Sequence, residues 1–288
     1  MRIIIPNLAI PALHNVARCL ESVKHNCGIE PLLWDCTNKS FIDMCDEVNP
    51  DIIFLHSSQL DAAFTLASQE FNFKYILIAE NPIPAQKSPA AVLTSSLSAK
   101  NWKDNTPVVV ARDGSRIAEI HNSSYDSTMA SDILIQTNEG KITNDMLHYI
   151  SFLTSSYHTK VIGDAPVAFH QYLGKVNMFE RATFIKSAKI LIDFYGTECW
   201  DAAYLKVPAI CRKKAADNFW EFNNIKELEV RIDALLHKDA KRSKYIEECY
   251  KAVYNGNTQY HVAANLFQRI DENNIAQTLH SFVKELQV

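Results

Sequence analysis

Apolar and polar positions alternate along the first part of the chain with two distinct periods. Short, almost continuous apolar runs predict β-strands at residues 2–5, 30–34, 51–56, 73–79 and 107–111. Apolar residues spaced three and four positions apart predict helices at residues 12–25 and 60–70. Strands that are apolar throughout are typical of a parallel sheet covered on both faces, and their alternation with helices favours βαβ units.

A polar segment, HNSSYDSTMAS at residues 121–131, separates this part from a second alternating part. There the pattern predicts strands at residues 132–136, 159–162, 172–174, 189–193 and 208–211. It predicts helices at residues 143–153, 179–188, 198–205, 225–236 and 243–254, and a helical tail of two segments at residues 260–286. We therefore expect an α/β fold with two Rossmann-like domains facing a cleft, parallel sheets and a helical C-terminal tail. The expected bounds are 1–125, 126–265 and, for the last helix, 266–288.

Glycine is scarce: only 7 of the 288 residues are glycine, and no two lie within six positions of each other. This spacing excludes the dense glycine loops of dinucleotide-binding, P-loop and kinase sites. A nucleotide site in this chain must therefore draw its glycines from separate segments.

Charge and cysteine content bear on partners and location. The formal net charge of −4 provides no global attraction to nucleic acid or to acidic membranes, although a local basic patch stays possible. The seven cysteines form an odd set without a CxxC pair, as expected for reduced thiols rather than a disulfide framework or a zinc site. No apolar run approaches the length of a membrane span, and the first strand does not resemble a signal peptide. We expect a soluble, cytoplasmic protein with no metal site.

Four short motifs follow one another between residues 159 and 211. They are VIGDAP at 161–166, YLG at 172–174, two acidic residues eight positions apart (Asp193 and Asp201), and AYLKVPAI at 203–210. Their order resembles the C-terminal, donor-binding domain of GT-B glycosyltransferases of the retaining group 1 type. That family has Gly-Asp-Gly-Pro, FLG, two acids that are usually Glu, and A-x-G-x-P-V-I. This sequence departs from the pattern at the acids and at Ala165 and Lys206, where the family uses glycine.

The resemblance implies a nucleotide-sugar site in the second domain. The donor-binding residues would be Gly163, Asp164, Gly174, Gly196, Thr197, Asp201 and Lys141. Glycines after strands let the backbone approach a ligand, and helix N-termini favour a diphosphate. By the resemblance, Asp201 would bind the donor ribose and Asp193 would lie near the sugar as a catalytic group. The alternative is that Asp193 merely ends a strand and Asp201 caps or solubilises a helix.

The groups that would stabilise the leaving diphosphate depart most from the family pattern. The sequence has no Asp-x-Asp pair, which favours a metal-independent reaction supported by helix dipoles and basic side chains. The family places an Arg and a Lys after the first strand of this domain; Lys141 is the nearest match and the Arg is absent. Arg112 and Arg116 are candidates to replace it, and solvated surface charge is the alternative for each basic residue.

The first domain would hold the acceptor and supply catalytic groups. His56 and Glu80 end two successive predicted strands, and Asn7 follows the first strand. A neutral His or a carboxylate there could act as a general base or stabilise an oxocarbenium-like centre. The alternative for His56 is a capping or hydrogen-bonded residue at a strand end.

The function expected from the resemblance is transfer of a sugar from a nucleotide-sugar, with UDP as the expected nucleotide, to an acceptor hydroxyl. The acceptor would be a saccharide, a lipid-linked sugar or a hydroxymethylated base of viral DNA, and the acidic net charge disfavours DNA. No separate cofactor is expected, and the last helix would cross back to the first domain. A catalytically inert GT-B-like binding module and a sugar-nucleotide epimerase of the same fold remain the alternatives.

Overall fold

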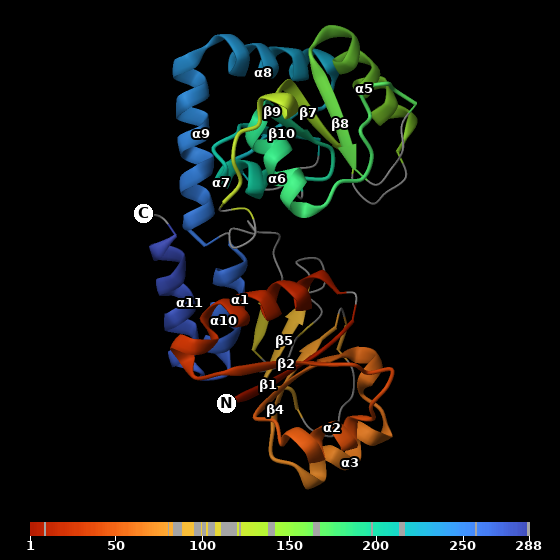
Figure 1. Cartoon of the computed structure of the whole chain (residues 1–288), viewed down its shortest axis with the longest axis vertical. Helices are drawn as coiled ribbons and strands as arrows, with labels where there is room; N and C mark the ends of the chain where they lie inside the picture. Colours follow the sequence, from red (N-terminus) through yellow and green to blue (C-terminus); the bar gives the residue numbers. More distant parts are fainter. Residues whose placement is uncertain are drawn as a thin grey trace. The chain divides into compact units, whose positions relative to one another are not determined.

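The computed structural model divides the chain into two compact units. Unit 1 comprises Met1–Arg112 and Gln259–Val288, and unit 2 comprises Asp113–Thr258. The structure describes residues 1–8, 10–79, 81–82, 88–94, 99, 102, 107–110, 120, 122–137, 142–163, 168–196, 198–212, 217–256 and 258–286. Each unit contains one parallel sheet with helices packed around it (Figure 1).

The sheet of unit 1 has six parallel strands in the order β2-β1-β3-β4-β5-β6. Its strands are β1 (Arg2–Pro6), β2 (Glu30–Trp34), β3 (Ile52–His56), β4 (Lys74–Ile78), β5 (Ala91–Thr94) and β6 (Val108–Val110). β5, with the sequence AVLT, lies in the proline- and serine-rich stretch where the apolar pattern predicted no strand. Strand order reverses between β1 and β3, and this reversal defines a topological switch point at their carboxyl ends.

Helices α1 (Pro11–Cys27), α2 (Phe41–Val48) and α3 (Ala62–Glu70) connect the first four strands. α2 begins at Ser40, whose side chain accepts the backbone N–H of Asp43, and it buries Phe41, Met44 and Cys45. This 3–4 spacing is helical, but the short α2 was not predicted from the sequence. Phe41 joins an aromatic cluster in which its ring centroid lies 5.9 Å from that of Phe64.

The last two helices, α10 (Gln259–Arg269) and α11 (Asn273–Glu285), belong to unit 1 and pack on α1 (Figure 1). The Tyr260 hydroxyl donates to Ser22 Oγ at 2.9 Å. Lys74 Nζ donates to the carbonyl of Ile270 at 2.9 Å and pairs with Glu272 at 2.8 Å. The tail of unit 1 thus starts at residue 259, whereas the sequence pattern placed residues 259–265 in the second domain.

The sheet of unit 2 has five parallel strands in the order β11-β10-β9-β7-β8. They are β7 (Ser131–Thr137), β8 (Thr159–Gly163), β9 (Ala188–Asp193), β10 (Ala209–Cys211) and the two-residue β11 (Trp220–Glu221), which was not predicted. The order reverses between β7 and β9, so these two strands form the switch point of this sheet. The predicted strand at 172–174 is a single bridge, in which Tyr172 pairs with Val161.

Among the described residues of unit 2, five helices accompany this sheet. They are α5 (Asn144–Ser156), α6 (Met178–Ser187), α7 (Cys199–Tyr204), α8 (Ile225–His237) and α9 (Asp239–Tyr254). A 3-10 turn at Ser127–Met129 precedes β7, within the segment expected to be a linker. In the described part of the chain, no helix combines the length and apolarity needed to cross a bilayer.

Candidate functional site

The switch point of unit 2 lies where β7 and β9 end. The register pairs Gln136 with Asp193, so Thr137 and Asp193 stand at the carboxyl ends of these two adjacent strands. In open parallel sheets, ligands bind just beyond these ends at the point where strand order reverses. The motif residues Gly163, Asp193 and Gly196 all lie at this edge or in the loops that leave it.

Asp193 organises the loop that connects β9 to α7. Its side chain is fully buried. One carboxylate oxygen accepts the backbone N–H of Tyr195 at 2.9 Å, and the other accepts that of Glu198 at 2.6 Å. Burial raises the pKa of the Asp193 carboxyl, and these backbone N–H groups oppose that effect. The carboxylate therefore holds its own loop in place, and contact with a donor sugar stays a prediction.

Glu198 continues this network toward α6. Its carboxylate lies 2.9 Å from the guanidinium of Arg181, and both side chains are largely buried. Arg181 Nε is buried without a hydrogen-bond partner among the described residues. The four sequence motifs do not include this pair, because Arg181 lies on a helix outside them. The ion pair ties the first residues of α7 to α6, which gives the loop two independent supports.

Asp201 lies in the first turn of α7, and its side chain is only 2% exposed. An acid that merely solubilised a helix would be exposed, so this burial argues against that alternative. The predicted contact with the donor ribose remains a prediction.

The loop after β8 is tied closely to the sheet edge. Gly163, Gly174 and Gly196 all have positive φ angles, of 138°, 92° and 76°. A Cβ atom at Gly163 would lie 1.8 Å from the carbonyl oxygen of Thr137, so no other residue fits there without movement of the backbone. The Gly163 N–H donates to the carbonyl of Gly174 at 3.1 Å, and the Tyr172 hydroxyl donates to that of Gly163 at 2.8 Å. These contacts bring the first two motifs together.

Lys206 occupies the position where the resembling family has glycine. Its backbone has a φ of 60°, the left-handed conformation that glycine adopts most readily. Its ammonium group lies 4.7 Å from the centre of the Tyr250 ring, within cation–π distance. The turn between α7 and β10 thus keeps a glycine-like backbone with a lysine in place.

Several residues expected in the site lie outside the described residues. They are Glu80, Lys141, Asp164 and Thr197, together with Arg112, Arg116 and Ala165. Their predicted roles stay predictions.

His56 ends β3, next to the switch point of unit 1, and is half-buried. Its Nδ1 accepts the backbone N–H of Ser58 at 3.3 Å and lies 2.8 Å from the Ser58 hydroxyl. Its own backbone N–H donates to Gln59 Oε1 at 2.9 Å, which completes a capping box. Because a backbone N–H occupies Nδ1, the neutral ring carries its proton on Nε2. In this form His56 offers a hydrogen-bond donor at Nε2, and it also fills the capping role left open from the sequence.

Gln59 links His56 to a thiol at the same sheet edge. Gln59 Nε2 lies 3.1 Å from Sγ of Cys36. Asn7, the acceptor-side candidate after β1, is held by its backbone: its N–H donates to the carbonyl of Trp34 at 2.8 Å. Burial raises the pKa of the Cys36 thiol. Cys36 and Gln59 were not predicted as site residues, although the i, i+3 spacing of His56 and Gln59 is that of a capping box.

Among the described residues, no three or more His, Cys, Asp or Glu side chains lie together in a way that could hold a metal ion.

Comparison with known proteins identifies the architecture. No protein-family model and no curated protein matches the sequence. Solved structures do match its fold. A glycosyltransferase from Rickettsia africae is 13% identical with a TM-score of 0.67, over 94% of this chain and 97% of that one. An α-glucosyltransferase bound to UDP-glucose and to DNA with an abasic site is 10% identical with a TM-score of 0.64, over 94% and 99%. A UDP-N-acetylglucosamine 2-epimerase is 8% identical with a TM-score of 0.53, over 94% and 95%.

The chain has the GT-B fold. Its α/β class and its two parallel, Rossmann-like sheets agree with what the motifs at residues 159–211 implied. Both glycosyltransferases and epimerases share this GT-B architecture, so the likeness establishes the fold and does not distinguish between the two reactions.

Proposed function

We propose that this protein is a sugar-nucleotide enzyme, and specifically a glycosyltransferase that moves a sugar from a UDP-sugar to an acceptor hydroxyl. The observation that carries the proposal is the edge of unit 2 at which β7 and β9 end. There a buried carboxylate, Asp193, organises the loop before α7, and Gly163 lets two backbone segments meet. The likeness to an α-glucosyltransferase structure solved with UDP-glucose supports a nucleotide-sugar ligand at this edge.

Within this proposal, the donor is held mainly by backbone and by Asp201. Asp201, buried in the first turn of α7, would accept hydrogen bonds from the ribose hydroxyls. The Asp193 and Arg181–Glu198 contacts would keep that turn in position while the leaving group departs. No metal ion takes part in this scheme, and retention of configuration is the expected outcome from the two acids.

His56 would act on the acceptor side as a hydrogen-bond donor. Its Nδ1 is occupied by Ser58, so Nε2–H is the group available to a substrate oxygen. This role differs from the general base considered from the sequence, because a protonated Nε2 has no lone pair to accept a proton. Glu80 stays the candidate for the base.

Donor binding is the first test. Calorimetry with UDP, UDP-glucose, UDP-N-acetylglucosamine, GDP and ADP is expected to give binding for the uridine nucleotides. Asp201→Asn is expected to weaken UDP binding at least tenfold with a native circular dichroism spectrum. Asp233→Asn, a change at an acid that is 52% exposed and far along the sequence on α8, serves as the matched control and is expected to leave affinity unchanged. Absence of binding to all five nucleotides would refute the proposal.

An epimerase of the same fold is the second candidate, favoured by the likeness to a UDP-N-acetylglucosamine 2-epimerase. An epimerase changes the stereochemistry of the sugar without an acceptor, whereas a glycosyltransferase releases UDP and needs one. NMR of UDP-N-acetylglucosamine incubated with the protein alone separates them, since only epimerisation produces a new sugar-nucleotide spectrum. UDP binding without any turnover, with or without acceptors, would instead indicate an inert binding module.

The acceptor is a hydroxyl on a saccharide, a lipid-linked sugar or a modified base of DNA. The α-glucosyltransferase with bound DNA motivates the last of these, and the net charge of −4 disfavours it. A gel-shift titration of duplex DNA at increasing salt tests it: electrostatic DNA binding would weaken steeply with salt, and absence of a shift at low salt would exclude DNA.

A further inference from the structure

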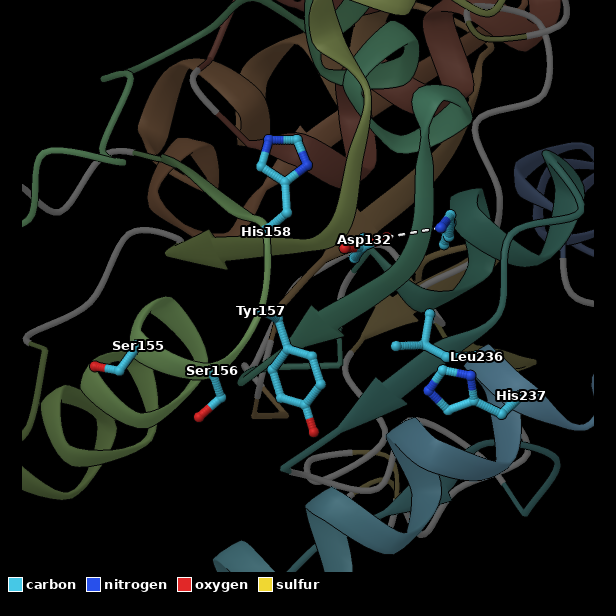
Figure 2. A pocket seen from close by; sticks show the side chains of 8 residues that line it. Asp132, Ser155, Ser156, Tyr157, His158, Leu236 and His237 are labelled. Carbon is cyan, nitrogen blue, oxygen red and sulfur yellow. Dashed lines mark ion pairs between the residues drawn. The ribbon is translucent and has the colours of Figure 1, made fainter.

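Unit 2 has a cavity of about 670 Å³ at the edge of its sheet opposite the proposed donor site. Asp132 and Lys189, each the second residue of its strand (β7 and β9), line one part of it. The end of α5 contributes Ser155 and Ser156, and His237 ends α8 (Figure 2). Parallel strands have their amino and carboxyl ends at opposite edges, so this cavity is separate from the donor edge. Its volume lies within the range of roughly 300–1,000 Å³ typical of small-molecule sites.

The charges that line the cavity are already paired. Lys189 Nζ lies 2.8 Å from Asp132 Oδ1. Beside His237, Lys238 pairs with Asp233 at 3.2 Å. A charged ligand would therefore find no uncompensated partner among these groups. The ends of α5 and α8 direct carbonyl groups toward this edge and add partial negative charge, which disfavours phosphate or carboxylate ligands.

The same groups can still exchange many neutral hydrogen bonds. The Lys189–Asp132 contact uses one of three ammonium N–H groups and one of two carboxylate oxygens. Two serine hydroxyls and the imidazoles of His158 and His237 add groups that can both donate and accept. Donors and acceptors mixed in this way, with no net charge, match a ligand that carries many hydroxyl groups.

The Tyr157 and His237 rings provide flat surfaces for such a ligand. Figure 2 shows the Tyr157 ring, from the end of α5, and the His237 ring, from the end of α8, in the same cavity. Burial, together with the nearby Glu229 and Asp233 carboxylates, raises the pKa of Tyr157, so its hydroxyl stays protonated. Aromatic rings with a polar tip suit ligands that are apolar on one face and hydroxylated at the edge, which describes a sugar ring.

We propose that this cavity binds an uncharged saccharide. The proposal does not depend on glycosyl transfer or on UDP binding, because it concerns the opposite edge of the sheet. A sugar would place its ring face on Tyr157 and exchange hydroxyl hydrogen bonds with His237 and with the Lys189–Asp132 pair.

Saturation-transfer NMR on the full chain tests the proposal with three uncharged probes: maltotriose, cellotriose and N,N′-diacetylchitobiose. At least one is expected to show transfer and a titratable dissociation constant. His237→Ala is expected to weaken that binding about fivefold, as loss of one hydrogen bond would. Tyr157→Leu, which keeps an apolar side chain but no ring, is expected to weaken it at least tenfold.

A matched control comes from the same unit. His148→Ala changes an exposed histidine of α5 that does not line the cavity, and it is expected to leave saccharide binding unchanged. UDP affinity is expected to be the same in all three variants, so failure here and failure of the donor proposal can be told apart. Three results would each overturn the inference: no transfer from any probe, binding unaffected by both cavity variants, or displacement of the saccharide by inorganic phosphate. His237 is exposed, so its variant keeps the test decisive even if Tyr157→Leu does not fold.

Discussion

The carboxylate of Asp193 accepts the backbone N–H of Glu198 at 2.6 Å, across the loop that joins the central strand of unit 2 to α7. This contact lets the buried end of β9 determine where α7 begins. Asp193→Asn would turn an amide N–H toward a backbone N–H that needs an acceptor. We expect this variant to lose about 1–3 kcal/mol of unfolding free energy in urea titrations. Asp233→Asn, on the surface, is expected to change it by less than about 0.5 kcal/mol; equal stabilities of the two variants would contradict this account.

Gly163 has no room for a side chain. A Cβ atom would lie 1.8 Å from the Thr137 carbonyl oxygen, so Gly163→Ala must displace one of the two strand ends. We expect a loss of about 2–4 kcal/mol in urea unfolding, together with weaker UDP binding. Gly28→Ala is the control: Gly28 also has a positive φ, of 62°, but a Cβ atom there would meet no atom within 4 Å. Its expected cost is only about 1 kcal/mol.

Lys206 combines a left-handed backbone with a ring contact to Tyr250. Lys206→Ala removes the cation–π contact but keeps a side chain at a left-handed backbone position. We therefore expect it to lose about 0.5–1 kcal/mol of unfolding free energy. Lys206→Gly loses the same contact but adopts the φ of 60° readily, and we expect it to be about 1 kcal/mol more stable than the alanine variant. Urea unfolding of the two variants checks this order, and a more stable alanine variant would refute it.

Acid is expected to weaken the packing of α10 on α11 through a histidine pair. The rings of His261 and His280 lie 5.6 Å apart. Burial and the neighbouring His280 lower the pKa of His261 to about 4. In the unfolded chain, this histidine has an ordinary pKa near 6.5, so on acidification it binds a proton before the folded protein does. The contribution of His261 to the free energy of unfolding is therefore complete above about pH 7 and decreases as the pH falls toward 4.

The midpoint of urea unfolding measured from pH 7 to pH 4 tests this linkage. His261→Gln is expected to flatten the decline, and His148→Gln, at an exposed position, is expected to leave it unchanged. An equal pH dependence in the wild type and in His261→Gln would contradict the assignment.

Much of the architecture was predictable because burial leaves a strong periodic signal. Strands such as β3 and β9 are apolar along nearly their whole length, as a sheet covered on both faces requires. Two strands escaped the prediction. β5 lies in a proline- and serine-rich stretch that hides its apolar run, and β11 has only two residues, too few for a period to emerge. Helix α2 escaped it although Phe41, Met44 and Cys45 carry the helical spacing.

The residues of the candidate site were also predictable in part from the sequence, whereas their contacts were not. By itself, the sequence determined which strand ends carry glycine and acid, because turns and ligand approaches require these residue types at fixed offsets from a strand. Only the tertiary structure decided what those residues contact. Asp193 binds its own loop, Arg181 reaches Glu198 from a helix outside the motifs, and His56 presents Nε2–H because Ser58 occupies Nδ1. Such contacts depend on directions and distances between side chains, and a one-dimensional pattern contains neither.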